Sequence, residues 1–295
     1  MFRRSACRRE AHGSARCAGG SLVSNTRTAI TTGANSGIGL ATTLELARRG
    51  FRSVGSVRSE AKAAVVANAA READVTIETV LLDVTDPDGC ARVIDDYKPF
   101  ALINNAGYSI TGSIEDVTDG EARAAFETMT LAPIRLARLA IPHMRDRGGG
   151  RIVNVSSIYG RTSTPLTGWY QGAKHALEGL SDALRMEVAR DGIRVILVEP
   201  GGFRTGIWEE TEREIAKRAG SRYDSAYRRT LTTTRLWQPF MGDPVQCAKT
   251  IGTALTTRRP RARYLVGYDA QALALWSSLT PTEVKDRIVR LVMSL

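Results

Sequence analysis

Tyr170 and Lys174 have the residue types and the spacing of an acid–base pair. They are four residues apart in a segment that is predicted to be helical, so both side chains lie on one helix face. A phenol has an ordinary pKa of about 10 and is a poor base at neutral pH, but a cation one helical turn away lowers that pKa. Because general acid–base catalysis favours a pKa near the working pH, the pair predicts a tyrosine that exchanges a proton with a substrate. The same spacing also occurs by chance on exposed helix faces, so the prediction needs support from elsewhere in the chain.

Ser157 gives that support, because it follows a predicted strand over 151–156. In a parallel sheet the carboxyl ends of the strands share one edge, and ligands bind there. A hydroxyl at this edge can hydrogen-bond a substrate oxygen and stabilise charge that develops on it. A predicted strand over 193–199 ends at the same edge and leads into three residues expected near a coenzyme: Pro200, Gly201 and Thr205.

A glycine-rich segment over 31–39, Thr-Thr-Gly-Ala-Asn-Ser-Gly-Ile-Gly, connects the first predicted strand to the first predicted helix. Glycines allow close approach of the backbone to a diphosphate, and a helix N-terminus supplies free N–H groups with a partial positive charge. The spacing G-x-x-x-G-x-G differs from the commoner fingerprint G-x-G-x-x-G, so the flanking strand and helix carry much of the prediction. The residues expected to contact the coenzyme here are Gly33, Asn35, Ser36, Gly37, Ile38 and Gly39.

The end of the second predicted strand bears on the choice of coenzyme. An NAD-preferring site places an acid there to bind the ribose 2′-hydroxyl. This chain has Val57 followed by Arg58, and a guanidinium suits a 2′-phosphate instead. We therefore expect NADP(H) to be preferred and NAD(H) to be the second choice. The alternative is that Arg58 is an ordinary solvated surface residue.

Two further strand ends complete the expected coenzyme site. Asp83 and Val84 close the third strand, where the Asp83 carboxylate can accept a hydrogen bond from an adenine amino group or can cap a turn. Asn105, Ala106 and Gly107 close the fourth strand and would let the backbone pass close to the coenzyme.

The order of apolar runs and helical segments predicts the elements that position these residues. Strands are expected over 28–32, 52–57, 75–82, 100–104, 151–156, 193–199 and 264–266. Helical spacing covers 38–49, 87–97, 120–147 and 169–190. Strands that are buried on both faces and separated by helices give a parallel sheet with right-handed crossovers. The expected fold class is α/β: a doubly wound, Rossmann-type sheet of about seven strands with helices on both faces, in one domain over 28–295.

The segment over 203–240 interrupts this alternation, because it is charged, aromatic and loop-rich. Since it follows a strand at the carboxyl edge, it is expected to act as a substrate lid; a plain surface excursion is the alternative. Its aromatic side chains favour a bulky, apolar substrate, although they would equally suit packing within the lid or a contact between subunits. They are Phe203, Trp208, Tyr223, Tyr227, Trp237 and Phe240.

Composition excludes several other classes of protein. The 295 residues are 43% hydrophobic and 24% charged, which fits a globular protein rather than a disordered one. The four cysteines are too far apart for a disulfide scaffold, no cysteine or histidine spacing indicates a metal site, and no apolar run is long enough for stable membrane insertion. Basic residues are not gathered with stacking aromatics, so no nucleic-acid partner is expected.

Residues 1–27 carry half of the net charge of +10, through six arginines against one acid. The segment has too few large apolar side chains to offset the entropy of ordering it, so a basic, disordered N-terminal extension is expected. An organelle transit peptide and a start codon placed too far upstream are the alternatives. Otherwise we expect a cytoplasmic protein. A nucleic-acid binder that uses this tail is a rival hypothesis, and it predicts salt-sensitive binding.

With these motifs identified, the chain resembles the short-chain dehydrogenase/reductase family over roughly 28–270. The motifs are TTGANSGIG (31–39), DV (83–84), NNAG (104–107), NVSS (154–157), YQGAK (170–174) and PGG (200–202). The resemblance implies proton exchange by Tyr170, orientation of the substrate oxygen by Ser157, and binding of the nicotinamide ribose by Lys174, which also lowers the pKa of Tyr170. It implies homodimers or homotetramers built on the helices near 120–147 and 169–190. The stretches over 179–188 and 198–205 are similar to the branch that acts on steroids, retinoids and other apolar alcohols.

One position departs from the family pattern. The family usually has an asparagine in the helix before the fifth strand, which feeds a water relay to the catalytic lysine. Here the position is Met129, whose thioether cannot replace an amide. A backbone carbonyl there, or Thr128 or Thr130, could still hold the water. We expect turnover that is lower and more dependent on pH.

The sequence therefore predicts an NADP(H)-dependent oxidoreductase that transfers a hydride between nicotinamide and a secondary alcohol or ketone. The alternative is a coenzyme-binding regulatory or scaffold protein with weak or no turnover. Met129 favours that alternative, and the intact Ser157, Tyr170 and Lys174 oppose it.

Overall fold

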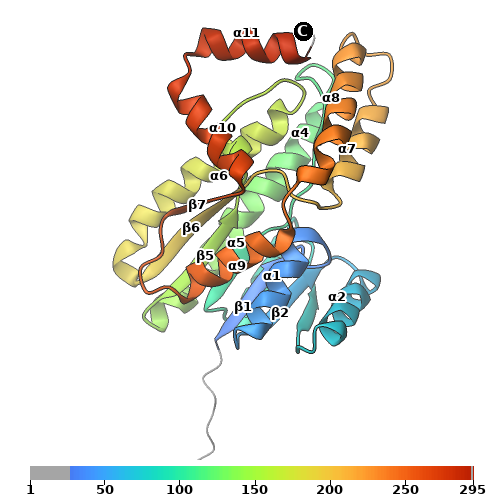
Figure 1. The fold of residues 1–295 in the computed structure, drawn as a ribbon. Coiled ribbons are helices and arrows are strands. Elements are labelled where there is room, and N and C mark those ends of the chain that lie inside the picture. Colours follow the sequence, from blue (N-terminus) through green and yellow to red (C-terminus); the bar gives the residue numbers. More distant parts are fainter. Residues whose placement is uncertain (1–26, 294) are drawn as a thin grey trace, which may run out of the picture.

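The computed structural model describes residues 27–293 and residue 295, so the expected N-terminal extension lies outside the described residues except for Arg27. Seven parallel strands form one sheet in the order β3-β2-β1-β4-β5-β6-β7 (Figure 1). The strands are β1 (Thr28–Thr32), β2 (Arg52–Val57), β3 (Glu78–Leu81), β4 (Ala101–Asn104), β5 (Gly150–Val155), β6 (Ile193–Pro200) and β7 (Arg263–Val266). The strands from β1 to β3 are added toward one edge of the sheet and those from β4 to β7 toward the other. Open sheets of this kind bind ligands at the point between β1 and β4 where this order switches. The expected Rossmann-type fold class is confirmed.

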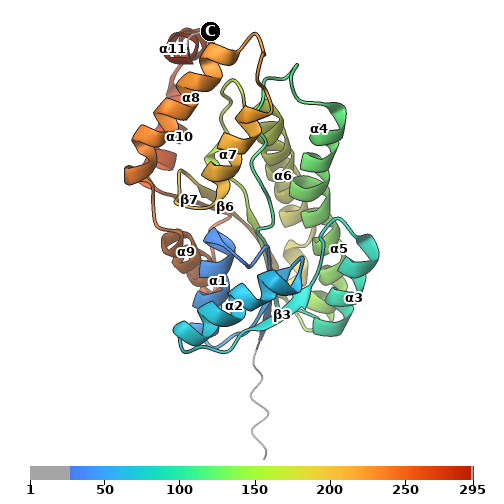
Figure 2. The same cartoon turned by 90° about the vertical axis from the view of Figure 1, so that its right-hand side faces the viewer.

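Helices cover both faces of the sheet, as Figure 2 shows most clearly for α1 and α9 on one face and α3 and α5 on the other. The first face carries α1 (Gly37–Arg48), α2 (Glu60–Glu72) and α9 (Pro244–Thr256). The second face carries α3 (Pro87–Tyr97), α5 (Ala132–Asp146) and α6 (Gly168–Glu187). Each face of the sheet is therefore sealed from water by its own helical layer.

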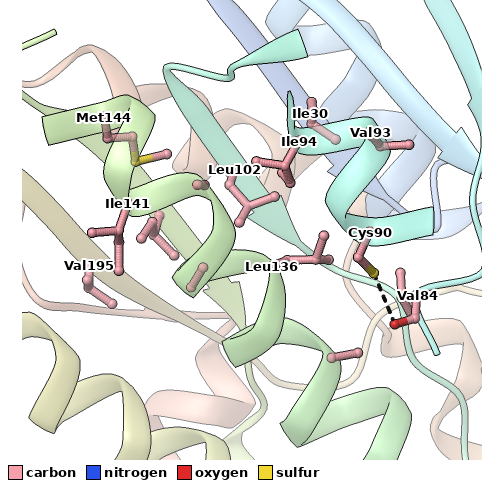
Figure 3. Packing of buried hydrophobic residues seen from close by; sticks show 14 of the residues in the cluster. Ile30, Val84, Cys90, Val93, Ile94, Leu102, Leu136, Ile141, Met144 and Val195 are labelled. Atoms are coloured by element: carbon pink, nitrogen blue, oxygen red, sulfur yellow. Dashed lines mark hydrogen bonds between the residues drawn. The ribbon is translucent and has the colours of Figure 1, made fainter. Parts of the chain in front are cut away.

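Neighbouring residues of a strand contribute to opposite cores, because successive side chains of a strand point to opposite faces. Ile152 packs with Leu136 and Met144 in the cluster drawn in Figure 3, whereas Val153 packs with Leu46 on the other face. Burial on both faces explains why β6 is largely an apolar run rather than an alternation of apolar and polar residues.

The predicted helix over 120–147 consists of three parts. α4 (Asp119–Phe126) begins at a capping box in which Thr118 and Glu121 exchange hydrogen bonds. A π-helical turn over Glu127–Leu131 follows, and α5 continues from it. A π turn changes which backbone carbonyls are bonded and turns the side chains that follow it, and such turns are frequent at functional sites.

The expectation that 203–240 is loop-rich was wrong, because this segment forms α7 (Ile207–Ala216), α8 (Asp224–Trp237) and a short 3₁₀ turn (Gln238–Phe240). The segment is rich in charged and polar residues, and few residues of α8 are buried: Ala226 and Tyr227 pack against Leu166 and Ile215, and the rest is mostly exposed. Figure 1 shows α7 and α8 beyond the carboxyl edge of the sheet, with α11 (Thr282–Met293) next to α8, while α10 (Tyr268–Leu279) lies nearer β7. Within 27–293, no helix is long and apolar enough to span a membrane.

Candidate active site

The glycine-rich turn between β1 and α1 has the geometry of an anion cradle. Gly33 and Gly37 have positive φ angles of +66° and +51°, which disfavour residues with a side chain. A Cβ on Gly39 would lie 2.2 Å from the carbonyl oxygen of Gly33, so this position has no room for one. Ser36 precedes α1 in an extended conformation, its side chain makes no capping hydrogen bond, and the first turn contains no acid. The N-terminal N–H groups and the helix dipole are therefore available to a phosphate.

Asn105 and Ala106 hold this turn in place. The Thr32 hydroxyl accepts hydrogen bonds from the backbone N–H groups of Asn105 and Ala106, each at 3.0 Å. The Asn105 side chain donates from Nδ2 to the carbonyls of Thr32 at 3.0 Å and Gly33 at 3.3 Å. Both residues were expected at the coenzyme, and the structure places them next to its cradle as supports of the turn.

The ends of β2 and β3 lie near each other at the same edge. Arg58 is exposed, and its charge helps to lower the pKa of Asp83. The larger cause of that lowered pKa is Thr85, whose N–H and hydroxyl donate to Asp83 Oδ1 at 2.9 and 2.7 Å. Asp83 therefore caps a turn, as its alternative interpretation predicted. The side chain of Val84 is buried in the core, so this residue can meet a ligand only through its backbone.

The segment after β6 closes against the cradle. Thr205 lies beside Gly37, since a Cβ on that glycine would be 2.9 Å from Thr205 Cγ2. The N–H of Gly202 donates to Asp269 Oδ2 at 2.5 Å, and a Cβ on Gly201 would overlap the same carboxylate. The Pro200–Gly201–Gly202 turn is thus fixed from behind by the start of α10.

Ser157, Tyr170 and Lys174 meet at the end of β5. Ser157 is buried at the start of a 3₁₀ turn (Ile158–Gly160), and its hydroxyl accepts from the Tyr159 N–H at 3.1 Å. A hydrogen bond with Ser157 acts on the Tyr170 phenol and lowers its pKa. Lys174 Nζ donates to the carbonyl of Val155 at 2.8 Å and lies 5.8 Å from the centre of the Tyr170 ring.

The pKa values in this group follow burial. Desolvation raises the pKa of Tyr170 to about 12, and the hydrogen bond with Ser157 only partly opposes it. Desolvation also lowers the pKa of Lys174 to about 8, against the opposing effect of the Glu178 charge. The net shift of the Tyr170 pKa is therefore upward, opposite to the lowering that was expected, because burial dominates it. The Lys174 ammonium donates to Val155 and is itself desolvated.

Met129 lies in the π-helical turn and is buried. Its side chain borders Gly107, where an added Cβ would be 3.5 Å from both Cγ and Sδ of Met129. The two neighbouring threonines already have partners: the Thr130 hydroxyl donates to the Ala173 carbonyl at 2.8 Å, and Thr128 hydrogen-bonds Tyr108. Each hydroxyl is therefore already engaged in one hydrogen bond.

Gln171 is a positioning residue that the sequence did not reveal. It is buried, and its Nε2 donates to the hydroxyls of Thr164 at 2.8 Å and Thr167 at 2.7 Å. Its Oε1 accepts from the Thr164 N–H at 3.0 Å, so the loop that precedes α6 is fixed beside Tyr170. A glutamine next to the tyrosine, with threonines four and seven residues before it, was the available signal.

The aromatic residues of the 203–240 segment do not form one substrate pocket. Phe203 is buried in the core, and Tyr227 is buried with its hydroxyl bonded to Asp116 and to the Ser113 N–H. Trp237 and Phe240 are 62% and 79% exposed and pack edge-to-face on each other. Tyr223 is half-buried, and the Trp208 side chain lies outside the description. Among the described residues, no group of histidine, cysteine and acidic side chains could hold a metal ion.

Comparison with known proteins agrees with this geometry. The family model for short chain dehydrogenases matches residues 27–216. An uncharacterized oxidoreductase of Bacillus subtilis, YusZ, is 34% identical over 275 residues, which cover 90% of this chain and 98% of that protein. Human retinol dehydrogenase 5 is 31% identical over 293 residues, with 92% and 91% covered, and is consistent with the steroid- and retinoid-type branch. A solved short-chain dehydrogenase of Streptomyces avermitilis superimposes with a TM-score of 0.74 at 30% identity, covering 91% of this chain and 97% of that one.

These matches extend across the nucleotide cradle and the Ser157, Tyr170 and Lys174 group. The fold binds NAD(P), and the chemistry of the family is dehydrogenation or reduction at CH–OH groups. The chain belongs to the short-chain dehydrogenase/reductase family of oxidoreductases.

Proposed function

We propose that this protein is an NADP(H)-dependent oxidoreductase that converts a bulky, apolar ketone to its secondary alcohol, or the reverse. One observation carries the proposal: Ser157, Tyr170 and Lys174 meet at the end of β5, next to the glycine cradle at the end of β1. The proposed unit is one domain over 28–295 with a lid over 203–240. A cytoplasmic location and a homodimer or homotetramer stay predictions.

The residues at the carboxyl edge fit a phosphorylated dinucleotide. The open N-terminus of α1 would bind the diphosphate through Ser36, Gly37, Ile38 and Gly39, with Gly33 and Asn35 shaping the turn. Arg58 would bind the 2′-phosphate, because it is exposed beside Asp83. Asp83 would accept from the adenine through its second oxygen. When bound, NADP(H) supplies or accepts the hydride.

The chain's own residues move the proton. In ketone reduction, the Tyr170 O–H bond breaks as an O–H bond forms on the substrate, while Ser157 hydrogen-bonds that oxygen. A Tyr170 pKa of about 12 keeps the phenol protonated at neutral pH, which suits an acid. Lys174 would bind the ribose of the coenzyme, and its positive charge would stabilise the phenolate as it forms.

An apolar substrate is supported by the surroundings of Tyr170. Its ring packs with a cluster that includes Met129, Tyr108, Phe126 and Trp169. Phe126 and Trp169 stack edge-to-face with ring centres 6.4 Å apart. The similarity to retinol dehydrogenase 5, whose name specifies an apolar alcohol, points the same way.

Absorbance at 340 nm tests the proposal, with purified protein, NADPH or NADH, and a panel of apolar ketones and secondary alcohols. We expect turnover with NADPH on at least one apolar ketone and a higher kcat/KM for NADPH than for NADH. Binding of NADPH without turnover on any substrate would support the alternative hypothesis of a coenzyme-binding regulatory or scaffold protein. Met129, which stands where the family usually has an asparagine, is the residue that favours this alternative.

A further inference from the structure

Between α6 and the sheet lies a row of charged side chains, of which the mechanism above uses only Lys174. Lys174, Glu178 and Asp182 follow one another at intervals of four along α6; Lys174 and Glu178 are buried, and Asp182 is half-buried. Glu199 stands opposite, near the end of β6, with none of its surface exposed. Charged groups of this kind are rarely buried without a reason, because desolvation disfavours the charged form.

Glu199 is held by two arginines rather than by a full set of hydrogen bonds. Its Oε1 lies 3.1 Å from Arg263 Nε, and its Oε2 lies 3.5 Å from Arg161 Nε. Arg263 also bonds Glu178 Oε2 at 3.1 Å and Asp182 Oδ2 at 2.6 Å. Arg263 therefore joins the acid on β6 to the two acids on α6.

Four oxygen atoms at the centre of this cluster are buried. Ser156 Oγ and Glu178 Oε1 have no hydrogen-bond partner among the described residues, and the two Glu199 oxygens have only their ion-pair contacts with Arg263 and Arg161. A Cβ on Gly160 would lie 2.7 Å from Ser156 Oγ and 3.3 Å from Glu178 Oε1, so both atoms border the same glycine. A purely structural ion-pair network usually satisfies such oxygens. Free lone pairs in a row can instead accept and release protons.

One end of this row of charged side chains lies near a cavity, and the other end is Lys174 in the active site. Arg161 and Arg263 line a cavity of about 350 Å³ together with Leu265, which is the register partner of Glu199 on β7. At the other end, Lys174 lies one helical turn from Glu178 and is bonded to Val155, the residue before Ser156. The Glu178 charge acts on Lys174 and raises its pKa against the effect of burial.

We propose that Glu178 and Glu199 form a proton path that connects Lys174 to solvent in the cavity beside Arg161 and Arg263. The inference rests on the proposed function. It gives this chain a route for the proton that does not depend on the amide missing at Met129.

Each step conserves charge and involves no electron transfer. In ketone reduction, Tyr170 gives its proton to the substrate oxygen and regains one from the Lys174 ammonium. Glu199 gives its proton to the Glu178 carboxylate, whose Oε1 borders Gly160, and Glu178 passes that proton on to the neutral Lys174 amine. Glu178 is thereby a carboxylate again, and Glu199 regains a proton from water in the cavity. Alcohol oxidation runs the same steps backwards.

The charges around Glu199 suit this role. Glu178 faces it from α6, Arg263 from β7, and Arg161 from the segment after the 3₁₀ turn. Burial and the Glu178 charge outweigh both arginines and raise the pKa of Glu199 to about 7. Its carboxyl group can therefore gain and lose a proton near neutral pH.

The test compares Glu199→Gln and Glu178→Gln with Asp182→Asn, a matched control that also touches Arg263 but lies off the path. We measure kcat for ketone reduction with NADPH from pH 5.5 to 9, together with KM and NADPH binding. We expect kcat of the wild type to fall above about pH 7, as Glu199 loses its proton. Each glutamine variant should lose about tenfold in kcat at pH 7 and should lose that limb, with KM and NADPH binding within about twofold.

Because the two acids act in series, the double variant should be no slower than either single variant. Circular dichroism checks folding, and if one glutamine variant does not fold, the other decides the question. A folded variant with the kcat and the pH profile of the wild type overturns the path while the proposed function stands. If the wild type reduces no ketone, both fall together.

Discussion

Lys174 is bonded to Val155 and not to Tyr170: its Nζ donates to the Val155 carbonyl at 2.8 Å, and the Tyr170 ring centre is 5.8 Å away. The contact attaches α6 to the end of β5, two residues before Ser157. It therefore fixes the spacing between the residue on the strand and the two residues on the helix. The lysine has a positioning role even before a ligand binds.

Removing the Tyr170 hydroxyl tests its role as the acid. Tyr170→Phe should lower kcat about a hundredfold or more, because general acid catalysis typically contributes about 10²–10⁴-fold. NADPH binding, followed by quenching of tryptophan fluorescence, should change little. A variant that keeps more than a tenth of the wild-type kcat would show that another group delivers the proton.

Arg58 should decide the choice between the two coenzymes. Its side chain is exposed, so Arg58→Ala should leave the fold intact. Loss of a charge-assisted hydrogen bond costs about 1.5–3 kcal/mol, so kcat/KM for NADPH should fall about 10- to 100-fold while that for NADH stays nearly constant. An unchanged ratio between the two coenzymes would leave Arg58 as a solvated surface residue.

Gly37 is a position where one methyl group should weaken coenzyme binding strongly. Its φ of +51° disfavours a side chain, and a Cβ would meet Thr205 Cγ2 at 2.9 Å. Gly37→Ala should weaken NADPH binding at least tenfold, measured by calorimetry. Gly179→Ala is the control, because nothing lies within 4 Å of a Cβ there. Equal effects of the two substitutions would contradict the cradle.

Met129→Asn restores the amide that the family pattern has at this position. The residue is buried in an apolar cluster, so the variant should lose about 1–3 kcal/mol of unfolding free energy. If the amide opens a second proton route, kcat should rise and its dependence on pH should weaken. An unchanged pH–rate profile in the folded variant would show that Met129 does not limit turnover.

Arg218 attaches the 203–240 segment to α4. Its Nη2 lies 2.6 Å from Glu121 Oε1, and this hydrogen bond is the main reason that the pKa of Glu121 is lowered to about 2. A carboxyl group with a lowered pKa stabilises the fold above its ordinary pKa, and this contribution is lost as the pH falls through the folded value. The free energy of unfolding should therefore decrease between about pH 5 and pH 2 in the wild type, and less steeply in Arg218→Ala.

The same variant tests the lid. Arg218→Ala should raise KM for the ketone several-fold and should increase cleavage by trypsin within 203–240. Arg235→Ala is the matched control, because Arg235 forms an exposed pair with Glu212 inside the same segment, and exposed pairs contribute little. If both variants keep the wild-type KM, the segment does not gate the site.

Much of the fold could be predicted from the sequence, because short strand-like runs alternate with segments of helical spacing. The strand over 28–32 and the helix over 87–97 were predicted with their observed bounds. The helices α7 and α8 were missed because charged and polar residues dominate them, although their few apolar residues have helical spacing.

Some features of the candidate site could likewise be predicted from the sequence, and others could not. The residues at the strand ends were predictable because a parallel sheet brings the ends together, and the structure places Thr205 beside Gly37. The support of the cradle by Asn105 was missed, because side-chain hydrogen bonds to a distant turn leave no local pattern. The predicted direction of the Tyr170 pKa shift also differs from the one in the structure. Spacing in the sequence indicates how near a cation lies, but it does not indicate how deeply the phenol is buried.

The bond between the Gly202 N–H and Asp269 has a consequence for shortened versions of this protein. Asp269 lies more than fifty residues beyond the end of the segment that the family model matches. A fragment cut to that segment would lack α10. The turn after β6 would then lose the hydrogen bond from the Gly202 N–H to Asp269. Efforts to make a minimal catalyst or to fuse a reporter at this end should therefore keep the chain through Leu279, where α10 ends.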